Sequence, residues 1–199
     1  MANIEKTMKN LNSHGFDTSY FKTGQEAVDY VVSQLSGETI GFGGSKTVEG
    51  LGLFERLGEN NTVYWHWKQE AGPARVNAAK ADVYLTSANA VSETGEIVNI
   101  DGAGNRVAAT LFGKKKIFML IGVNKITEDY DKAVWRARNV ASPLNARRFN
   151  RNTPCVKGEL KCHDCSSPDR ICGGLVVLWR KMMGTQKFEV IIIDEELGY

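Results

Sequence analysis

The chain has 199 residues, of which 42% are hydrophobic and 24% are charged, and its formal net charge is only +2. This length and composition are sufficient for one globular domain with a substantial core, so the chain does not depend on a bound metal to fold. The longest apolar runs, residues 117–123 and 175–179, fall far below the ~20 residues that span a bilayer, which excludes a membrane-spanning helix. The polar N-terminus has no apolar leader segment, and we therefore expect a cytoplasmic protein.

Hydrophobic residues recur along the chain with the periods of helices and strands, and glycine, serine and threonine residues mark the boundaries. Thr23 to Glu26 has the form of a capping box, and Ser45 can cap the next helix. In chain order, the predicted elements are a helix over 4–15, strand 16–21, helix 23–37, strand 39–42, helix 45–58, strand 62–67, helix 69–80, strand 82–87, strand 116–122, helix 128–141 and strand 188–194.

The alternation of strands and helices predicts an α/β fold, in which a mostly parallel sheet is flanked by helices. No internal repeat, low-complexity tract or linker divides the chain. We therefore expect a single domain over residues 1–199, with a cysteine-bearing insertion at residues 153–173.

All four cysteines of the chain lie in one window with the spacing C-x6-C-x2-C-x6-C: Cys155, Cys162, Cys165 and Cys172. Thiolates close a tetrahedral shell around zinc and also hold the corners of iron–sulfur clusters, so this window predicts a metal site. The spacing does not distinguish an iron–sulfur cluster from zinc. Two disulfides or four reduced thiols are the alternatives, and a cytosolic location disfavours the disulfides.

A glycine-rich segment joins the predicted strand 39–42 to the helix that follows. Such a loop offers backbone N–H groups and the positive end of a helix dipole to an anion. The segment is neither a complete dinucleotide fingerprint nor a P-loop, and a tight turn that requires a positive φ angle is the alternative interpretation. Its candidate ligand-binding residues are Gly41, Gly43, Gly44, Ser45 and Lys46.

Polar and charged residues gather in two further segments. Residues 87–106 place Glu93, Asp101, Asn105 and Arg106 among small residues between two apolar strands, and these are the components of a polar pocket. Residues 132–161 carry eight lysines and arginines against a single glutamate. This excess suits a phosphate, a carboxylate or an acidic partner protein, and a solvated helix face is the alternative. No interleaved aromatic run accompanies the charges, which argues against nucleic acid.

The stretch SANAVSETGEIVNIDGAGNR at residues 87–106, the later GVNKI at 122–126 and the TPC…CxxC…RIC pattern of the cysteine window resemble the lactate-utilisation (LUD) domain family. The resemblance covers roughly the whole chain. It implies a fold similar to the sugar-phosphate isomerase and CoA-transferase superfamily, and a role in bacterial oxidation of lactate beside iron–sulfur partners.

Two motifs of that superfamily are similar to segments of this chain. Residues 92–95, Ser-Glu-Thr-Gly, resemble the S-E-N-G segment whose glutamate is the nucleophile of one class of CoA-transferases, although Thr94 replaces the asparagine. The resemblance makes Glu93 the first catalytic candidate. Asp101 begins a segment similar to the D-G-A-D-E of ribose-5-phosphate isomerases and is the second candidate, but Gly104 and Asn105 replace the acidic pair.

The leading hypothesis is a LUD-domain protein of bacterial lactate or organic-acid metabolism that binds a small anionic metabolite and acts beside an iron–sulfur protein partner. An iron–sulfur cluster would then occupy the four cysteines. Two alternatives stay open. One is an acyl or CoA transferase with Glu93 as nucleophile and zinc at the cysteines. The other is a non-enzymatic, metal-dependent regulator.

Overall fold

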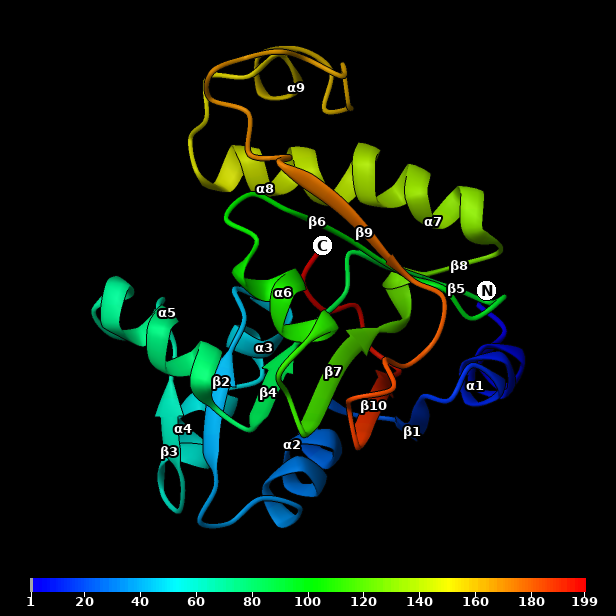
Figure 1. The fold of residues 1–199 in the computed structure, drawn as a ribbon. Coiled ribbons are helices and arrows are strands. Elements are labelled where there is room, and N and C mark those ends of the chain that lie inside the picture. Colours follow the sequence, from blue (N-terminus) through cyan, green and yellow to red (C-terminus); the bar gives the residue numbers. More distant parts are fainter. Residues whose placement is uncertain (1) are drawn as a thin grey trace.

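The computed structural model describes residues 2–199, and its centre is a six-stranded sheet (Figure 1). The strand order is β1-β10-β7-β4-β2-β3, and every neighbouring pair is parallel. The predicted α/β fold with a mostly parallel sheet is therefore confirmed. The strands are β1 (Asp17–Phe21), β2 (Thr39–Phe42), β3 (Thr62–Tyr64), β4 (Val83–Thr86), β7 (Lys116–Gly122) and β10 (Lys187–Ile193).

Both faces of this sheet are buried, because successive side chains of a strand point to opposite faces. In β7, Phe118 and Leu120 pack on one side and Ile117 and Met119 on the other. Helices α2 (Gly24–Ser33), α3 (Lys46–Gly50) and α4 (Leu53–Gly58) cover the first face. Helices α1 (Ile4–Ser13), α5 (Ala71–Lys80) and α6 (Asn105–Leu111) pack against the second.

A second, four-stranded sheet lies on that second face and was not anticipated from the sequence. Its order is β8-β5-β6-β9, formed by β5 (Ala90–Ser92), β6 (Ile97–Asp101), β8 (Ile126–Thr127) and β9 (Gly174–Leu178). The strands are short and include polar residues, so they give little periodic signal. The outer face of this sheet packs on helix α7 (Tyr130–Arg136).

Three predicted elements differ from the structure. The helix expected over 45–58 is divided into α3 and α4 at Gly52. The φ angle of Gly52 is +64°, a value that residues other than glycine rarely adopt. The strand expected over 62–67 ends at Tyr64, and the next residues form a turn that the Gln69 side chain holds by accepting a hydrogen bond from the Trp65 N–H at 2.9 Å. The helix expected to end at residue 141 continues through a π-helical turn (Ala137–Ala141) into α8 (Ser142–Arg148).

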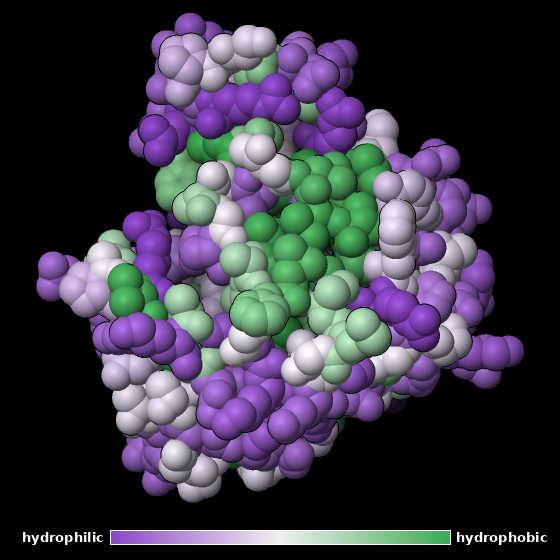
Figure 2. All heavy atoms as spheres, in the orientation of Figure 1, coloured by the Kyte–Doolittle hydropathy of each residue, from purple (hydrophilic) through white to green (hydrophobic). Residues whose placement is uncertain are grey.

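The cysteine-bearing residues follow α8 and reach β9 through one short helix, α9 (Pro154–Lys157). Between α9 and β9 the chain has neither helix nor strand, and in Figure 1 this segment lies above α8. Figure 2 shows an apolar area on the face of the molecule where β9 and α6 lie, bordered by hydrophilic residues. None of the helices in the described part of the chain is long and apolar enough to cross a membrane.

Candidate functional site

A cavity of about 560 Å³ opens at the carboxyl ends of the parallel strands. Residues that immediately follow β2, β3, β4 and β7 line it, among them Ser45, Trp67, Ser87 and Lys125. The remaining wall comes mainly from the segment after β6, from α8 and the residues that follow it, and from residues 170–172 before β9. Ligands of α/β proteins bind at this edge of the sheet, because the strand-to-helix loops converge there.

The charge of the cavity is strongly positive. Seven lysine and arginine side chains line it against one side-chain carboxylate, that of Asp101. Two of the seven, Arg75 and Arg151, form no side-chain hydrogen bond or ion pair to another residue in the range 2–199, and their donors are thus available to a ligand. The seven are Lys46, Arg75, Arg106, Lys125, Arg148, Arg151 and Arg170.

The guanidinium of Arg106 forms hydrogen bonds within the protein. Its guanidinium donates to the Ser87 carbonyl at 3.0 Å, to the Ile100 carbonyl at 2.8 Å and to the side-chain oxygens of Asn89 and Asn99. Because these acceptors come from the ends of β4 and β6, Arg106 ties the two sheets together at the cavity wall. This predicted ligand-binding residue lines the cavity, but its main contacts are structural.

The carboxylate of Asp101 also forms its contacts within the protein. Its carboxylate accepts hydrogen bonds from the backbone N–H groups of Gly104 and Val107, at 3.2 and 3.3 Å, and lies 3.7 Å from the Arg106 guanidinium. These contacts cap the start of α6, where the helix dipole favours a negative charge. The neighbouring Asn105 also lines the cavity, as expected.

Some residues of the glycine-rich loop line the cavity, and others pack against neighbouring elements. Gly44, Ser45 and Lys46 line the cavity, while the Ser45 hydroxyl accepts the Val48 N–H at 3.2 Å and so caps α3. Gly41 and Gly43 have a packing role. A side chain at Gly41 would meet the Ala78 carbonyl at 2.6 Å, and one at Gly43 would meet the Thr86 hydroxyl at 2.9 Å.

Aromatic side chains form one side of the cavity. Trp67, Phe149 and Tyr199 line it, and the Arg148 guanidinium lies between two of them, 4.5 Å from the Trp67 ring and 3.9 Å from the Phe149 ring. The buried Nδ1 atom of His66 has no hydrogen-bond partner within residues 2–199. Burial lowers the pKa of His66, so this wall presents a neutral imidazole.

Lys125 is a cavity residue that the sequence analysis did not single out. It lies in the turn directly after β7 and is only 3% exposed. Its Nζ donates to the Thr47 and Ser87 hydroxyls at 2.8 and 3.0 Å and to the Ala88 carbonyl at 3.1 Å. Burial, with the nearby cations Arg136 and Arg106, lowers the pKa of Lys125 to about 7. The segment GVNKI contained this residue, but no local pattern indicates that its amine reaches a cavity.

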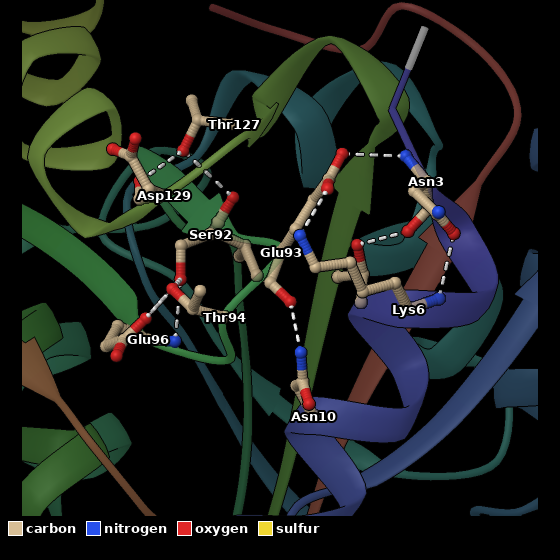
Figure 3. Close-up of polar contacts among 11 residues, drawn as sticks. Asn3, Lys6, Asn10, Ser92, Glu93, Thr94, Glu96, Thr127 and Asp129 are labelled. Atoms are coloured by element: carbon tan, nitrogen blue, oxygen red, sulfur yellow. Dashed lines mark hydrogen bonds and ion pairs between the residues drawn. The ribbon is translucent and has the colours of Figure 1, made fainter.

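Glu93 lies apart from this cavity and is not one of its lining residues. Its carboxylate accepts the Asn3 N–H at 2.8 Å and pairs with the Lys6 ammonium at 3.1 Å, while its own carbonyl accepts from Asn10 (Figure 3). The Asn3 N–H and then Lys6 lower the pKa of Glu93. The structure therefore directs this carboxylate to the start of α1, and it does not bring Glu93 together with Asp101 or the glycine loop.

The four cysteines line one small cavity of about 30 Å³ between α8 and the irregular segment before β9. All four are free thiols, and burial raises the pKa of Cys172. Within residues 2–199, no three His, Cys, Asp or Glu side chains stand close enough together to hold a metal ion. The small cavity and the large one share a wall, formed by Ser142, Arg170, Ile171 and Cys172.

The parallel sheet flanked by helices, with a large polar cavity at its carboxyl edge, defines an α/β domain. The chain belongs to the LUD domain family, whose sequence model matches residues 4–193. A search of curated proteins finds no match. Among solved structures, the chain is similar to the crystal structure of a DUF162 family protein from Deinococcus radiodurans, with a TM-score of 0.57 and 14% identity over 96% of this chain and 95% of that one. At this identity the likeness demonstrates the fold alone.

Proposed function

We propose that this LUD-domain protein binds a small anionic metabolite of lactate or related organic-acid metabolism in the large cavity, and that its four cysteines hold an iron–sulfur cluster. The observation that carries the proposal is the wall shared by the two cavities, to which Cys172 and Arg170 both contribute. An iron–sulfur cluster supplies one-electron transfer, which suits an accessory protein that works beside an iron–sulfur partner.

The charge of the large cavity supports an anionic ligand. Arg75 and Arg151 have unused donors, and guanidinium groups bind carboxylates and phosphates through paired hydrogen bonds. The volume of about 560 Å³ falls within the typical range of small-molecule sites, roughly 300–1,000 Å³, so a ligand larger than a three-carbon acid also fits.

The donor chemistry of the small cavity suits a metal or cluster, although the four sulfurs stand too far apart here to ligate one together and would have to move closer on binding. The central C-x2-C turn places the Asp164 N–H 3.4 Å from the Cys162 sulfur, and the Arg138 guanidinium lies 3.7 Å from the same sulfur. Such donors stabilise a thiolate, which is the ligating form of cysteine. Cys155, Cys162, Cys165 and Cys172 would hold the group, and zinc is the alternative occupant.

Metal content tests the cysteine site directly. The chain would be purified without oxygen and without added metals, and iron, zinc and acid-labile sulfide measured together with an absorbance spectrum. Iron with a similar amount of sulfide, lost in Cys165→Ser and kept in the neighbouring Ser166→Ala, is the expected result. Zinc without sulfide would refute the electron-transfer role and leave ligand binding untouched.

Ligand binding is tested separately by calorimetric titration with lactate, pyruvate and a phosphorylated three-carbon acid. The double substitution of Arg75 and Arg151 by alanine should weaken ligand binding at least tenfold, because it removes the two guanidinium groups whose donors are free to bind the ligand. Arg56→Ala provides the matched control, since Arg56 pairs with Asp29 on the surface and does not line the cavity. Equal affinities in all three proteins would contradict the assignment of the site.

A further inference from the structure

Two lysines are almost completely buried, each 3% exposed, and their surroundings differ. Lys114 donates to the carbonyls of Ala78, Ala79 and Ala81, at 2.9, 2.5 and 2.8 Å. These carbonyls belong to the C-terminal end of α5, where a cation is favoured by the helix dipole. Lys114 thus closes a helix end and does not line the large cavity.

Lys125 has a different set of partners and does line the cavity. Two of its three partners are hydroxyls, those of Thr47 and Ser87, which lie 3.4 Å from each other. Carbonyls only accept hydrogen bonds and therefore require a donating ammonium. Hydroxyls can also donate. The Thr47 hydroxyl gives its hydrogen to the Leu197 carbonyl at 3.1 Å, whereas the Ser87 hydroxyl has only distant acceptors, at 3.4 and 3.5 Å, and can turn its hydrogen to the lone pair of a neutral amine. No carboxylate is among the charged groups that act on Lys125 in residues 2–199.

We infer that the Nζ of Lys125 is a nucleophile that forms an imine with a small carbonyl compound carrying an anionic group, such as a 2-oxo acid, bound in the large cavity. The inference rests on the proposed anion site. The cations of the cavity wall would hold the anionic group, and the carbonyl carbon would meet the amine at the end of β7.

The chemistry needs no oxidant or reductant. The amine lone pair attacks the carbonyl carbon, and a proton moves from the nitrogen to the oxygen to give a carbinolamine. A second proton transfer to that hydroxyl expels water as the C=N bond forms, so amine and carbonyl yield imine and water. The Ser87 hydroxyl contacts the amine at 3.0 Å and is placed to pass these protons, while the Thr47 hydroxyl, which donates to the Leu197 carbonyl, holds the amine in position by accepting from it. A neutral amine near pH 7 is consistent with this role, since burial and two flanking guanidiniums lower the pKa of Lys125.

Reductive trapping tests the inference on the whole chain. Pyruvate, and in a separate experiment pyridoxal 5′-phosphate, would be incubated with the protein and sodium cyanoborohydride between pH 6 and 10, and modified lysines located by peptide mass analysis. The expected result is modification of Lys125 at least tenfold faster at pH 7.5 than that of the exposed Lys9, with Lys114 unmodified. Ser87→Ala should slow the reaction of Lys125 without abolishing it.

Failure to modify Lys125 with either reagent, or modification no faster than that of Lys9, would overturn the inference. Wild-type peptide mapping gives this answer even if Lys125→Met does not fold. Pyruvate binding measured by calorimetry separates the two proposals. Binding without trapping would refute imine formation and leave the anion site standing, whereas absence of both would remove the anion site as well.

Discussion

Replacing Arg106 by methionine should weaken the connection between the two sheets. Methionine keeps an unbranched apolar stem but is shorter than arginine and uncharged, so the substitution removes the guanidinium and leaves the space that it filled. Two backbone carbonyls, those of Ser87 and Ile100, lose this donor, and the Asp101 carboxylate loses its cation. The side chains of Arg106 and Asp101 are each only 12% exposed, so water does not readily replace what is lost.

The expected loss of unfolding free energy is about 3 kcal/mol. A hydrogen bond to a charged group contributes roughly 1.5–3 kcal/mol, and removing one partner of a buried ion pair costs about 3–5 kcal/mol. The lower end applies here because Asp101 keeps its two backbone donors at the start of α6. Such a loss is a large part of the ~5–15 kcal/mol that stabilises an ordinary domain.

Equilibrium unfolding in urea, followed by circular dichroism, measures this loss as a shift of the midpoint at constant slope. Arg106→Lys should recover less than half of it, because an ammonium cannot reproduce the fork of donors that reaches both sheets. Arg56→Met, which breaks an exposed ion pair, should leave the unfolding free energy almost unchanged. A loss below about 1 kcal/mol for Arg106→Met, or full recovery with lysine, would refute this account of the cavity wall.

Three further changes have defined outcomes. The low pKa of Lys125, about 7, means that the unfolded chain binds more protons than the folded one between pH 7 and 10. The unfolding free energy should therefore rise with pH in that window, by at most about 1.4 kcal/mol per unit, and Lys125→Met should lack this increment in urea titrations at several pH values. Glu93→Gln should lower the melting temperature, because it weakens the contacts of Glu93 with the start of α1, and should leave ligand affinity in the large cavity unchanged. A loss of thioester turnover or of ligand affinity with unchanged stability would instead favour the transferase hypothesis. Gly41→Ala should cost about 1–3 kcal/mol, because the new methyl group meets the α5 backbone, whereas Gly50→Ala has open space and should be neutral or slightly stabilising in the same unfolding assay.

Local sequence patterns predicted the central sheet and several helix boundaries well. The predicted strands 39–42 and 116–122 coincide with β2 and β7, because apolar runs between turn-forming residues are typical of buried parallel strands. The capping box at Thr23 is present. The Thr23 hydroxyl accepts a hydrogen bond from the Glu26 backbone N–H, and the Glu26 carboxylate accepts one from the Thr23 backbone N–H.

The continuation of α7 into α8 was missed for an identifiable reason. Pro143 cannot donate a helical hydrogen bond and usually marks a helix boundary. Here a π-helical turn precedes it, and the Ser142 hydroxyl donates to the Ala137 carbonyl at 2.8 Å. The proline then stands in the first turn of α8, the helical position where proline is best tolerated.

The sequence by itself determined the α/β fold, the glycine loop at the end of β2 and the gathering of four cysteines in one window, because each depends on residues close together in the chain. Only the tertiary structure decided which polar groups meet. The parallel strand order brings Ser45, Ser87 and Lys125 to one edge of the sheet from positions up to 80 residues apart. Glu93, only six residues from Ser87, is turned by the β5–β6 hairpin towards α1. Distance along the chain does not set distance in space, since strand pairing and helix packing place each side chain through contacts that no local pattern encodes.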